Sequence, residues 1–248
     1  MNDSLRIVLV GTQHPGNIGS AARAMKTMGL GRLVLVAPQR FPDPDAYALA
    51  AGANDVIDRA EIHPTLASAV ADCRLVLAST ARQRTVPMPE LSPREGAQRL
   101  LEAQVHSEVA LVFGRERTGL DNDELQLCHA AICIPANPVY SSLNLAAAVQ
   151  VLTYEWRQAM LASAPTESPP ASTDPDDQPA NHAEMEGFFS HLGALLDDID
   201  FHKGKAPDMV TQRLRRLFLR ARPDPRELRI LRGIISDTQR LLRARPKS

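Results

Sequence analysis

Short apolar runs alternate with helix-like segments along the first 160 residues, and this alternation limits the folds that the chain can adopt. Apolar runs bounded by glycine, proline or polar residues predict strands, here at Leu5–Val10, Leu33–Val36, Asp55–Ile57, Leu75–Ala78, Val109–Phe113 and Ala131–Ile134. Helices are expected between them, at Ser20–Met28, Ala46–Ala51, Pro64–Ala71, Pro93–Ala103, Asp121–Cys128 and Ser142–Leu161. Strands that alternate with helices predict an α/β domain with a mostly parallel sheet.

Four of the loops that follow strands are rich in small polar or charged residues, namely those after Val10, Ala78, Phe113 and Ile134. Ligands of open parallel sheets bind beyond the carboxyl ends of the strands, so these loops are expected to converge on one site. The loop from Gly11 to Gly19 lacks both the Gly-Lys-Ser/Thr ending of a phosphate loop and the Gly-x-Gly-x-x-Gly spacing. A nicotinamide-dependent dehydrogenase is therefore disfavoured.

The net charge of −1 hides a division along the chain. Residues 1–202 hold 14 Lys and Arg against 25 Asp and Glu, a net of −11, whereas residues 203–248 hold 14 against 4, a net of +10. Between the two parts, residues 162–181 contain five prolines, four acidic residues and no large apolar side chain. We expect a domain at 1–161, a flexible linker at 162–181 and a basic helical domain at 182–248.

The basic tail is expected to be all-helical, with an apolar core face formed by Met209, Val210, Leu214, Leu217 and Phe218. Its positive charge predicts a polyanionic partner, contacted by the surface residues Arg213, Arg215, Arg216, Arg220 and Arg222. The alternative is a solvated basic helix pair without a partner.

Composition and local sequence indicate the cellular compartment expected for the chain and whether a metal is expected. It has no run of 18 apolar residues, and its first residues lack the order of a secretory signal, so we expect neither a membrane span nor secretion. Cys73, Cys128 and Cys133 form no CxxC pair, which disfavours disulfides and favours a reducing cytosol. His129 lies between two of these cysteines at no common zinc spacing, so no metal is expected.

Three loop motifs, taken together, are specific. They are Asn17-x-Gly19-x-x-x-Arg23, Phe113-Gly114-x-Glu116-x-x-Gly119-Leu120, and Ile134-Pro135 followed by Ser141-Ser142-Leu143-Asn144. This set resembles the three motifs of the SPOUT methyltransferases, and more narrowly their ribose 2′-O-methyltransferase branch. The stretches 21–30 and 217–223 are also similar to the bacterial TrmJ type, which modifies nucleotide 32 in the tRNA anticodon loop.

The resemblance implies an α/β fold whose C-terminal part forms a deep trefoil knot, and S-adenosylmethionine as the cofactor. By position, the cofactor contacts of the family fall on Ser79, Thr80, Ala81, Gly114, Ile134, Ser141, Ser142 and Leu143. The catalytic positions fall on Arg23, Asn17, Glu116, Ser142 and Asn144. Arg23 would face the RNA, and because an arginine stays protonated its expected role is to bind a phosphate and polarise the ribose hydroxyl.

The resemblance also implies tRNA as the partner and a homodimer with composite sites. The small and apolar residues Ala146, Ala147, Ala148 and Val149 suit close helix packing across such an interface, or packing on the chain's own sheet. Two other functions stay open. One is a non-catalytic RNA-binding protein on the same fold, and the other is a related enzyme that methylates rRNA or another tRNA nucleotide.

Overall fold

The computed structural model describes residues 4–81, 88–105, 107–163, 178–202 and 208–244. The chain divides into two compact units, residues 1–166 and residues 167–248. The expected linker falls mainly on residues 164–177, which lie outside the described residues.

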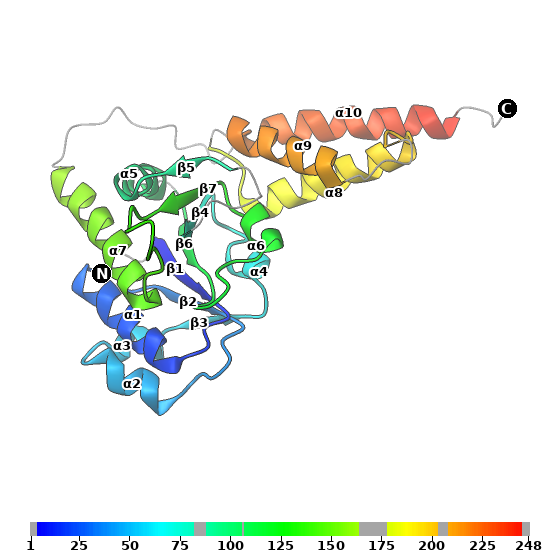
Figure 1. Ribbon diagram of the computed structural model, residues 1–248. Helices are drawn as coiled ribbons and strands as arrows, with labels where there is room; N and C mark the ends of the chain where they lie inside the picture. Colours follow the sequence, from blue (N-terminus) through cyan, green and yellow to red (C-terminus); the bar gives the residue numbers. More distant parts are fainter. Residues whose placement is uncertain (1–3, 82–87, 106, 164–177, 203–207, 245–248) are drawn as a thin grey trace. The chain divides into compact units, whose positions relative to one another are not determined.

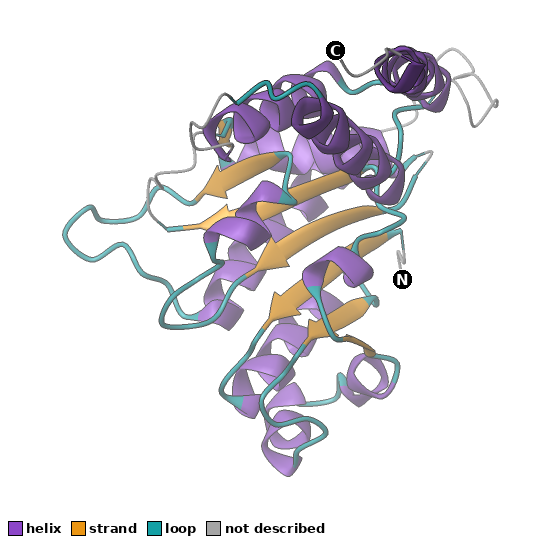
Figure 2. Ribbon diagram, turned by 90° about the vertical axis from the view of Figure 1, so that its right-hand side faces the viewer, coloured by secondary structure: helices purple, strands orange, loops and turns teal. Residues whose placement is uncertain are grey.

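The first unit is built on one parallel sheet (Figure 1). Its strands are β1 (Leu5–Val10), β2 (Leu33–Val36), β3 (Glu61–His63), β4 (Leu75–Thr80), β5 (Glu90–Leu91), β6 (Val109–Phe113) and β7 (Ala130–Cys133). They lie in the order β3-β2-β1-β6-β4-β7-β5, and every neighbouring pair is parallel. The strand arrows in Figure 2 accordingly point the same way, which brings the carboxyl ends to one edge of the sheet. The α/β class with a parallel sheet is confirmed.

Helices cover both faces of the sheet because its central strands are apolar on both faces. Leu5, Ile7 and Leu9 of β1 pack into one core, whereas the alternate residues Val8 and Val10 pack into another. The first core is completed by α1 (Pro15–Thr27), α2 (Pro44–Ala50), α3 (Asn54–Asp58), α5 (Pro93–Gln104) and α7 (Leu145–Ala162). The second core is completed by the short helices α4 (Leu66–Ala69) and α6 (Asn122–Gln126).

Several expected boundaries were wrong. Asp55–Ile57 is not a strand but part of α3, and the sequence pattern missed the short strands β3 and β5. Helix α1 begins at Pro15 rather than Ser20, because a proline is tolerated in the first turn, where its missing N–H leaves no bond unmade. Helix α7 begins at Leu145 rather than Ser142, and its N-cap is Asn144. The expected trefoil knot stays a prediction.

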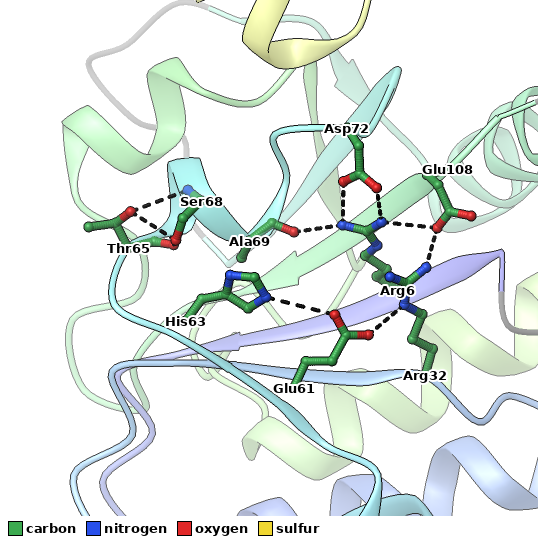
Figure 3. Close-up of polar contacts among 9 residues, drawn as sticks. All are labelled: Arg6, Arg32, Glu61, His63, Thr65, Ser68, Ala69, Asp72 and Glu108. Atoms are coloured by element: carbon green, nitrogen blue, oxygen red, sulfur yellow. Dashed lines mark hydrogen bonds and ion pairs between the residues drawn. The ribbon is translucent and has the colours of Figure 1, made fainter.

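A cluster of charged side chains ties the amino-terminal ends of the strands together (Figure 3). The Arg6 guanidinium, whose side chain is only 4% exposed, donates to both carboxylate oxygens of Asp72, to the Ala69 carbonyl at 2.9 Å and to Glu108 at 3.1 Å. Arg32 shares Glu108 with Arg6. Since this cluster lies at the strand ends opposite to the polar loops, it is a structural element rather than part of a ligand site.

In the residues that the structure describes, all the secondary structure of the second unit is helical, as expected. It consists of α8 (His182–Asp198), α9 (Asp208–Ala221) and α10 (Pro225–Ala244). Its core is Ala180, Met185, Phe188, Phe189, Leu196, Leu228 and Ile235, with Phe218 packed against it. The expected core face was therefore wrong for Met209 and Leu217, which are 63% and 47% exposed, because the unit buries the Phe188–Phe189 face of α8 instead.

No helix among the described residues is long and apolar enough to cross a membrane.

Candidate active site

A cavity of about 430 Å³ lies at the carboxyl edge of the sheet. It is lined by the end of β4, the loop after β6, the loop after β7 and the first turn of α7. All eight residues expected to contact a cofactor line it, namely Ser79, Thr80, Ala81, Gly114, Ile134, Ser141, Ser142 and Leu143. The structure thus brings the end of β4 and the second and third loop motifs to one cavity, whereas the first motif does not line it.

Gly114 allows the chain to fold back on itself at the cavity. A Cβ atom on Gly114 would lie 2.2 Å from the backbone of Gly119 and Leu120, which is too close for any side chain. Gly119 itself has a φ of +70°, and its N–H donates to the Arg115 carbonyl at 2.9 Å. Gly114, which is expected to contact the cofactor, is therefore required in the first place to let the loop from residue 115 to residue 119 fold back.

Glu116 is the centre of a hydrogen-bond network that joins the loops. Its carboxylate accepts from the backbone N–H groups of Gln13 and His14 at 3.1–3.2 Å and from the Asn17 Nδ2 at 2.9 Å. Gln13 and His14 directly precede α1, and His14 has no side-chain cap of its own. Glu116 therefore caps the amino-terminal end of α1 from another loop, where a negative charge is favoured by the helix dipole.

Asn144 extends this network to α7. Its Oδ1 accepts from the N–H groups of Ala146 and Ala147 as the N-cap of the helix, at 2.9 and 3.4 Å. Its Nδ2 donates to the Asn17 Oδ1 at 3.1 Å, and Asn17 in turn donates to Glu116. We call this series, Asn144 to Asn17 to Glu116, the amide relay. It fixes the position of α7 relative to α1.

The relay sets the ionisation of Glu116. Burial raises the pKa of its carboxyl, but the hydrogen bonds from the Asn17 amide and from backbone N–H groups outweigh burial and leave that pKa below its ordinary value. Glu116 is therefore a carboxylate at neutral pH, held by donors on both oxygens. Such a group positions its neighbours rather than accepting a proton from a substrate.

The other two expected catalytic residues lie apart from the relay. Ser142 is exposed and lines the cavity. Arg23 is exposed on α1, six residues beyond Asn17, which places it about 240° further around the helix. Three of the five residues are thus joined in one network, two of the five, Glu116 and Ser142, line the cavity, and Arg23 takes no part in either.

The arginines of the helical unit differ in their surroundings. Arg215 is largely buried, donates to both oxygens of Glu186 and stacks 4.3 Å from the centre of the Phe189 ring. Arg213, Arg216, Arg220 and Arg222 are exposed. Arg215 is therefore engaged in holding α9 on α8, whereas the other four present their charge to solvent.

Sequence reasoning missed part of the cavity lining. Phe113, Leu120, Leu145 and Ala148 supply apolar surface, and Arg115, Arg117 and Thr118 supply polar surface beside the expected Glu116. Only Phe113 stands at the end of a strand, the position that signals a site residue. The others lie in the loop after β6 or in α7. Sequence reasoning also missed the cap function of Asn144, because Ser141 and Ser142 are equally good caps by residue type.

The described residues contain no group of three or more His, Cys, Asp or Glu side chains able to hold a metal ion. The Nδ1 of His129 instead accepts from the Val76 N–H at 3.1 Å. Burial raises the pKa of the Cys73 and Cys128 thiols to about 12, so both stay protonated at neutral pH.

Comparison with known proteins defines the class to which this fold and site belong. The SpoU rRNA methylase family matches residues 4–154, which is more than half of the chain. The chain is therefore a methyltransferase of the SpoU rRNA methylase family.

The remainder of the chain matches a narrower group. Residues 183–247 match the C-terminal domain of the tRNA methyltransferase TrmJ. A relative from Cronobacter sakazakii, named tRNA (cytidine/uridine-2′-O-)-methyltransferase TrmJ, is 51% identical over 239 residues, which cover 96% of this chain and 97% of the relative. A protein of the same name from Photorhabdus laumondii is 49% identical and covers 97% of this chain and 98% of its own length. The chain belongs with these TrmJ methyltransferases.

Solved structures of similar proteins support the same family assignment. The crystal structure of TrmJ from Z. mobilis has a TM-score of 0.81 at 38% identity and covers 94% of this chain and 98% of its own. A probable methylase family protein from Haemophilus influenzae has a TM-score of 0.64 at 39% identity, covering 98% of this chain and 99% of its own. The SpoU methyltransferase AviRb from Streptomyces viridochromogenes, in complex with AdoMet, is 19% identical with a TM-score of 0.52, and it covers 66% of this chain and 63% of its own, so it supports the fold alone.

Proposed function

We propose that this methyltransferase transfers a methyl group from S-adenosylmethionine to the ribose 2′-hydroxyl of nucleotide 32 in the anticodon loop of tRNA. The observation that carries the proposal is the cavity at the carboxyl edge, which gathers all eight expected cofactor residues beside the amide relay. The names of the relatives, which specify tRNA and 2′-O-methylation of cytidine or uridine, support the same reaction.

The cavity fits S-adenosylmethionine by size and chemistry. Its volume of about 430 Å³ lies within the usual range of small-molecule sites, about 300–1,000 Å³. Phe113, Leu120 and Ile134 offer apolar surface for a flat ring, and Ser79 and Thr80 offer hydroxyl groups. When bound, S-adenosylmethionine supplies a methyl group whose positively charged sulfur leaves as an oxygen nucleophile attacks the methyl carbon in line.

The residues around the cavity would prepare the ribose hydroxyl. The amide relay fixes the start of α7, which follows the loop that carries Ser142, and we assign to the exposed Ser142 a hydrogen bond to the ribose. As the bond would form between the methyl carbon and the 2′-oxygen, the carbon–sulfur bond would break with its electron pair left on a neutral thioether sulfur, and the hydroxyl proton would leave to solvent. A guanidinium at the adjacent phosphate favours the developing negative charge on that oxygen. We assign this last role to Arg23.

A homodimer would complete the site. Neither Asn17 nor Arg23 lines the cavity of its own chain, and Arg23 lies about 240° around α1 from Asn17, which faces the relay. We infer that Arg23 of one protomer serves the cavity of its partner. Of the small residues considered for the interface, Val149 is fully buried in its own core and Ala148 packs against that core, which leaves the partly exposed Ala146 and the exposed Ala147 for contact with a second chain.

The Arg23→Ala variant tests the assignment. We expect methyl transfer to be abolished, while S-adenosylmethionine binding measured by calorimetry stays near normal. Arg99→Ala, at an exposed arginine on α5, is the matched control. Mass mapping of ribose-methylated nucleosides in tRNA identifies the nucleotide. Activity of Arg23→Ala close to wild type would remove Arg23 from the catalytic set, and methylation at another nucleotide would overturn position 32.

The helical unit would bind tRNA through phosphates. Arg213, Arg216 and Arg220 are exposed on α9, and removing one phosphate contact should reduce the log–log salt slope of binding by about 0.9 on a duplex region. We therefore expect the triple alanine variant to bind tRNA more weakly and with less salt dependence, without change in the methylated nucleotide. The double variant Arg94→Ala with Arg99→Ala, on α5 of the first unit, is the control. Equal slopes for both variants would show that this surface does not bind tRNA.

A further inference from the structure

Two side chains that directly precede cavity-lining residues in the sequence are unusually exposed. Val139 is 92% exposed and Tyr140 is 82% exposed, the two highest values among the large apolar and aromatic side chains that the structure describes. Tyrosine is ordinarily at least half-buried in a folded protein. Aromatic residues make up only 4% of the chain, so their placement is informative.

The turn that carries Tyr140 is held from within. The Tyr140 N–H donates to the Asn137 carbonyl at 2.9 Å, and the Val139 N–H donates to the Asn137 Oδ1 at 3.0 Å. Asparagine at the first position and proline at the second, here Pro138, are the residues that such a β-turn favours. The turn therefore holds the ring in solvent without help from a neighbouring element.

The position of this turn relates it to the reaction. It lies in the loop between β7 and α7, and Ser141, Ser142 and Leu143, which follow Tyr140 directly, line the cavity. The next residue, Asn144, is fixed by the amide relay. An exposed aromatic ring is thus held beside the place where the proposed function puts the ribose.

We propose that Tyr140 stacks on the base of the nucleotide whose ribose is methylated and thereby holds that ribose at the cavity. This inference rests on the proposed function and adds a substrate-contacting residue to it. Proteins that act on single-stranded RNA loops splay out bases and stack them on aromatic side chains. Stacking tolerates any base because every base has a flat face, so Tyr140 would bind cytidine and uridine alike.

Kinetic constants for tRNA test the contact. Stacking on one aromatic side chain, removed by alanine, corresponds to about a 5- to 150-fold loss of affinity. We expect Tyr140→Ala to raise KM for tRNA by a factor in this range, Tyr140→Phe to behave like wild type, and both to bind S-adenosylmethionine normally by calorimetry. Val139→Ala, in the same turn but without an aromatic ring, is the matched control and should stay within about twofold of wild type. An unchanged KM for Tyr140→Ala would overturn the inference.

A substrate lacking the base separates stacking from a structural effect on the turn. With a tRNA that is abasic at the methylated nucleotide, wild type and Tyr140→Ala should bind equally, because no base is left to stack. A penalty that persists on the abasic tRNA would overturn the proposed contact. Tyr140→Trp adds a direct signal, since its fluorescence should be quenched by intact tRNA but not by the abasic form. The only natural tryptophan, Trp156, is fully buried and gives a constant background.

The same experiments distinguish this inference from the proposed function. Methylation of tRNA by the wild-type protein, mapped by mass, tests the function without reference to Tyr140. Methylation by wild type with identical constants for Tyr140→Ala would overturn the stacking contact alone. No methylation of any tRNA nucleotide by wild type would overturn both.

Discussion

Replacing Glu116 by glutamine would remove the negative charge at the centre of the amide relay while keeping the size of the side chain. The carboxylate of Glu116 accepts from Gln13, His14 and Asn17, and its two oxygens share these donors. A glutamine offers one oxygen, and its NH₂ group would face N–H donors. The change thus leaves at least one donor at the start of α1 without an acceptor.

The loss of stability follows from these hydrogen bonds. A hydrogen bond to a charged group contributes about 1.5–3 kcal/mol, and the charge at the helix terminus adds about 0.3–1 kcal/mol. Since glutamine keeps part of the network, we expect a loss of about 2–4 kcal/mol in the free energy of unfolding. For a unit of this size the corresponding fall in Tm is about 4–16 °C.

Fluorescence of Trp156 provides the assay, because this single tryptophan is buried in α7 and reports on the first unit alone. Glu102→Gln makes the same chemical change at an exposed position on α5 and should leave Tm unchanged. Equal Tm values for Glu116→Gln and Glu102→Gln would refute the view that Glu116 caps α1 and holds the relay.

The pH dependence of this difference has a defined sign. Because the folded state lowers the pKa of the Glu116 carboxyl, the unfolded state binds more protons in acid. The stabilisation is therefore fully present above the unfolded value of about 4.3 and is lost as the pH falls through the folded value. The Tm gap between wild type and Glu116→Gln should be constant near neutral pH and should narrow below about pH 4.3. A gap that persists unchanged into stronger acid would contradict an ionised Glu116.

Four further variants test other parts of the structure. Arg6→Met leaves its acidic partners without a buried guanidinium and should cost about 2–4 kcal/mol in urea unfolding, whereas a loss below about 0.5 kcal/mol would show that the cluster is not stabilising. Gly114→Ala forces a Cβ to within 2.2 Å of backbone, so Tm and S-adenosylmethionine affinity should fall together; a fall in affinity at unchanged Tm would show that the glycine serves only the ligand. Arg215→Ala should lower the thermal stability of the helical unit, followed by circular dichroism, by about 1–3 kcal/mol, because it removes the pair with Glu186. Arg213→Ala should instead leave stability unchanged and weaken tRNA binding, and the reverse pattern would contradict the roles assigned to these two arginines.

The helices and strands of the first unit were predictable where the pattern was long or fully apolar. Leu5–Val10 and Val109–Phe113 form strands at the expected bounds, since a run that is apolar at nearly every position suits a strand covered on both faces. Short segments were not predictable. Glu61–His63 and Glu90–Leu91 become strands only because β2 and β7 lie beside them, and a few residues carry too little periodicity to signal this.

The sequence by itself determined which residue types stand at the ends of the strands, and hence which loops meet, because parallel strands bring their carboxyl ends to one edge. It also determined the basic character of residues 203–248, since charge is a property of composition. Only the tertiary structure decided what each side chain contacts. Glu116 caps α1 from a loop about one hundred residues away, and Asn144 rather than Ser142 caps α7 because Asn17 lies within reach of its amide. Contacts between residues so far apart in the chain depend on how the loops pack, and local sequence patterns carry no information about that packing.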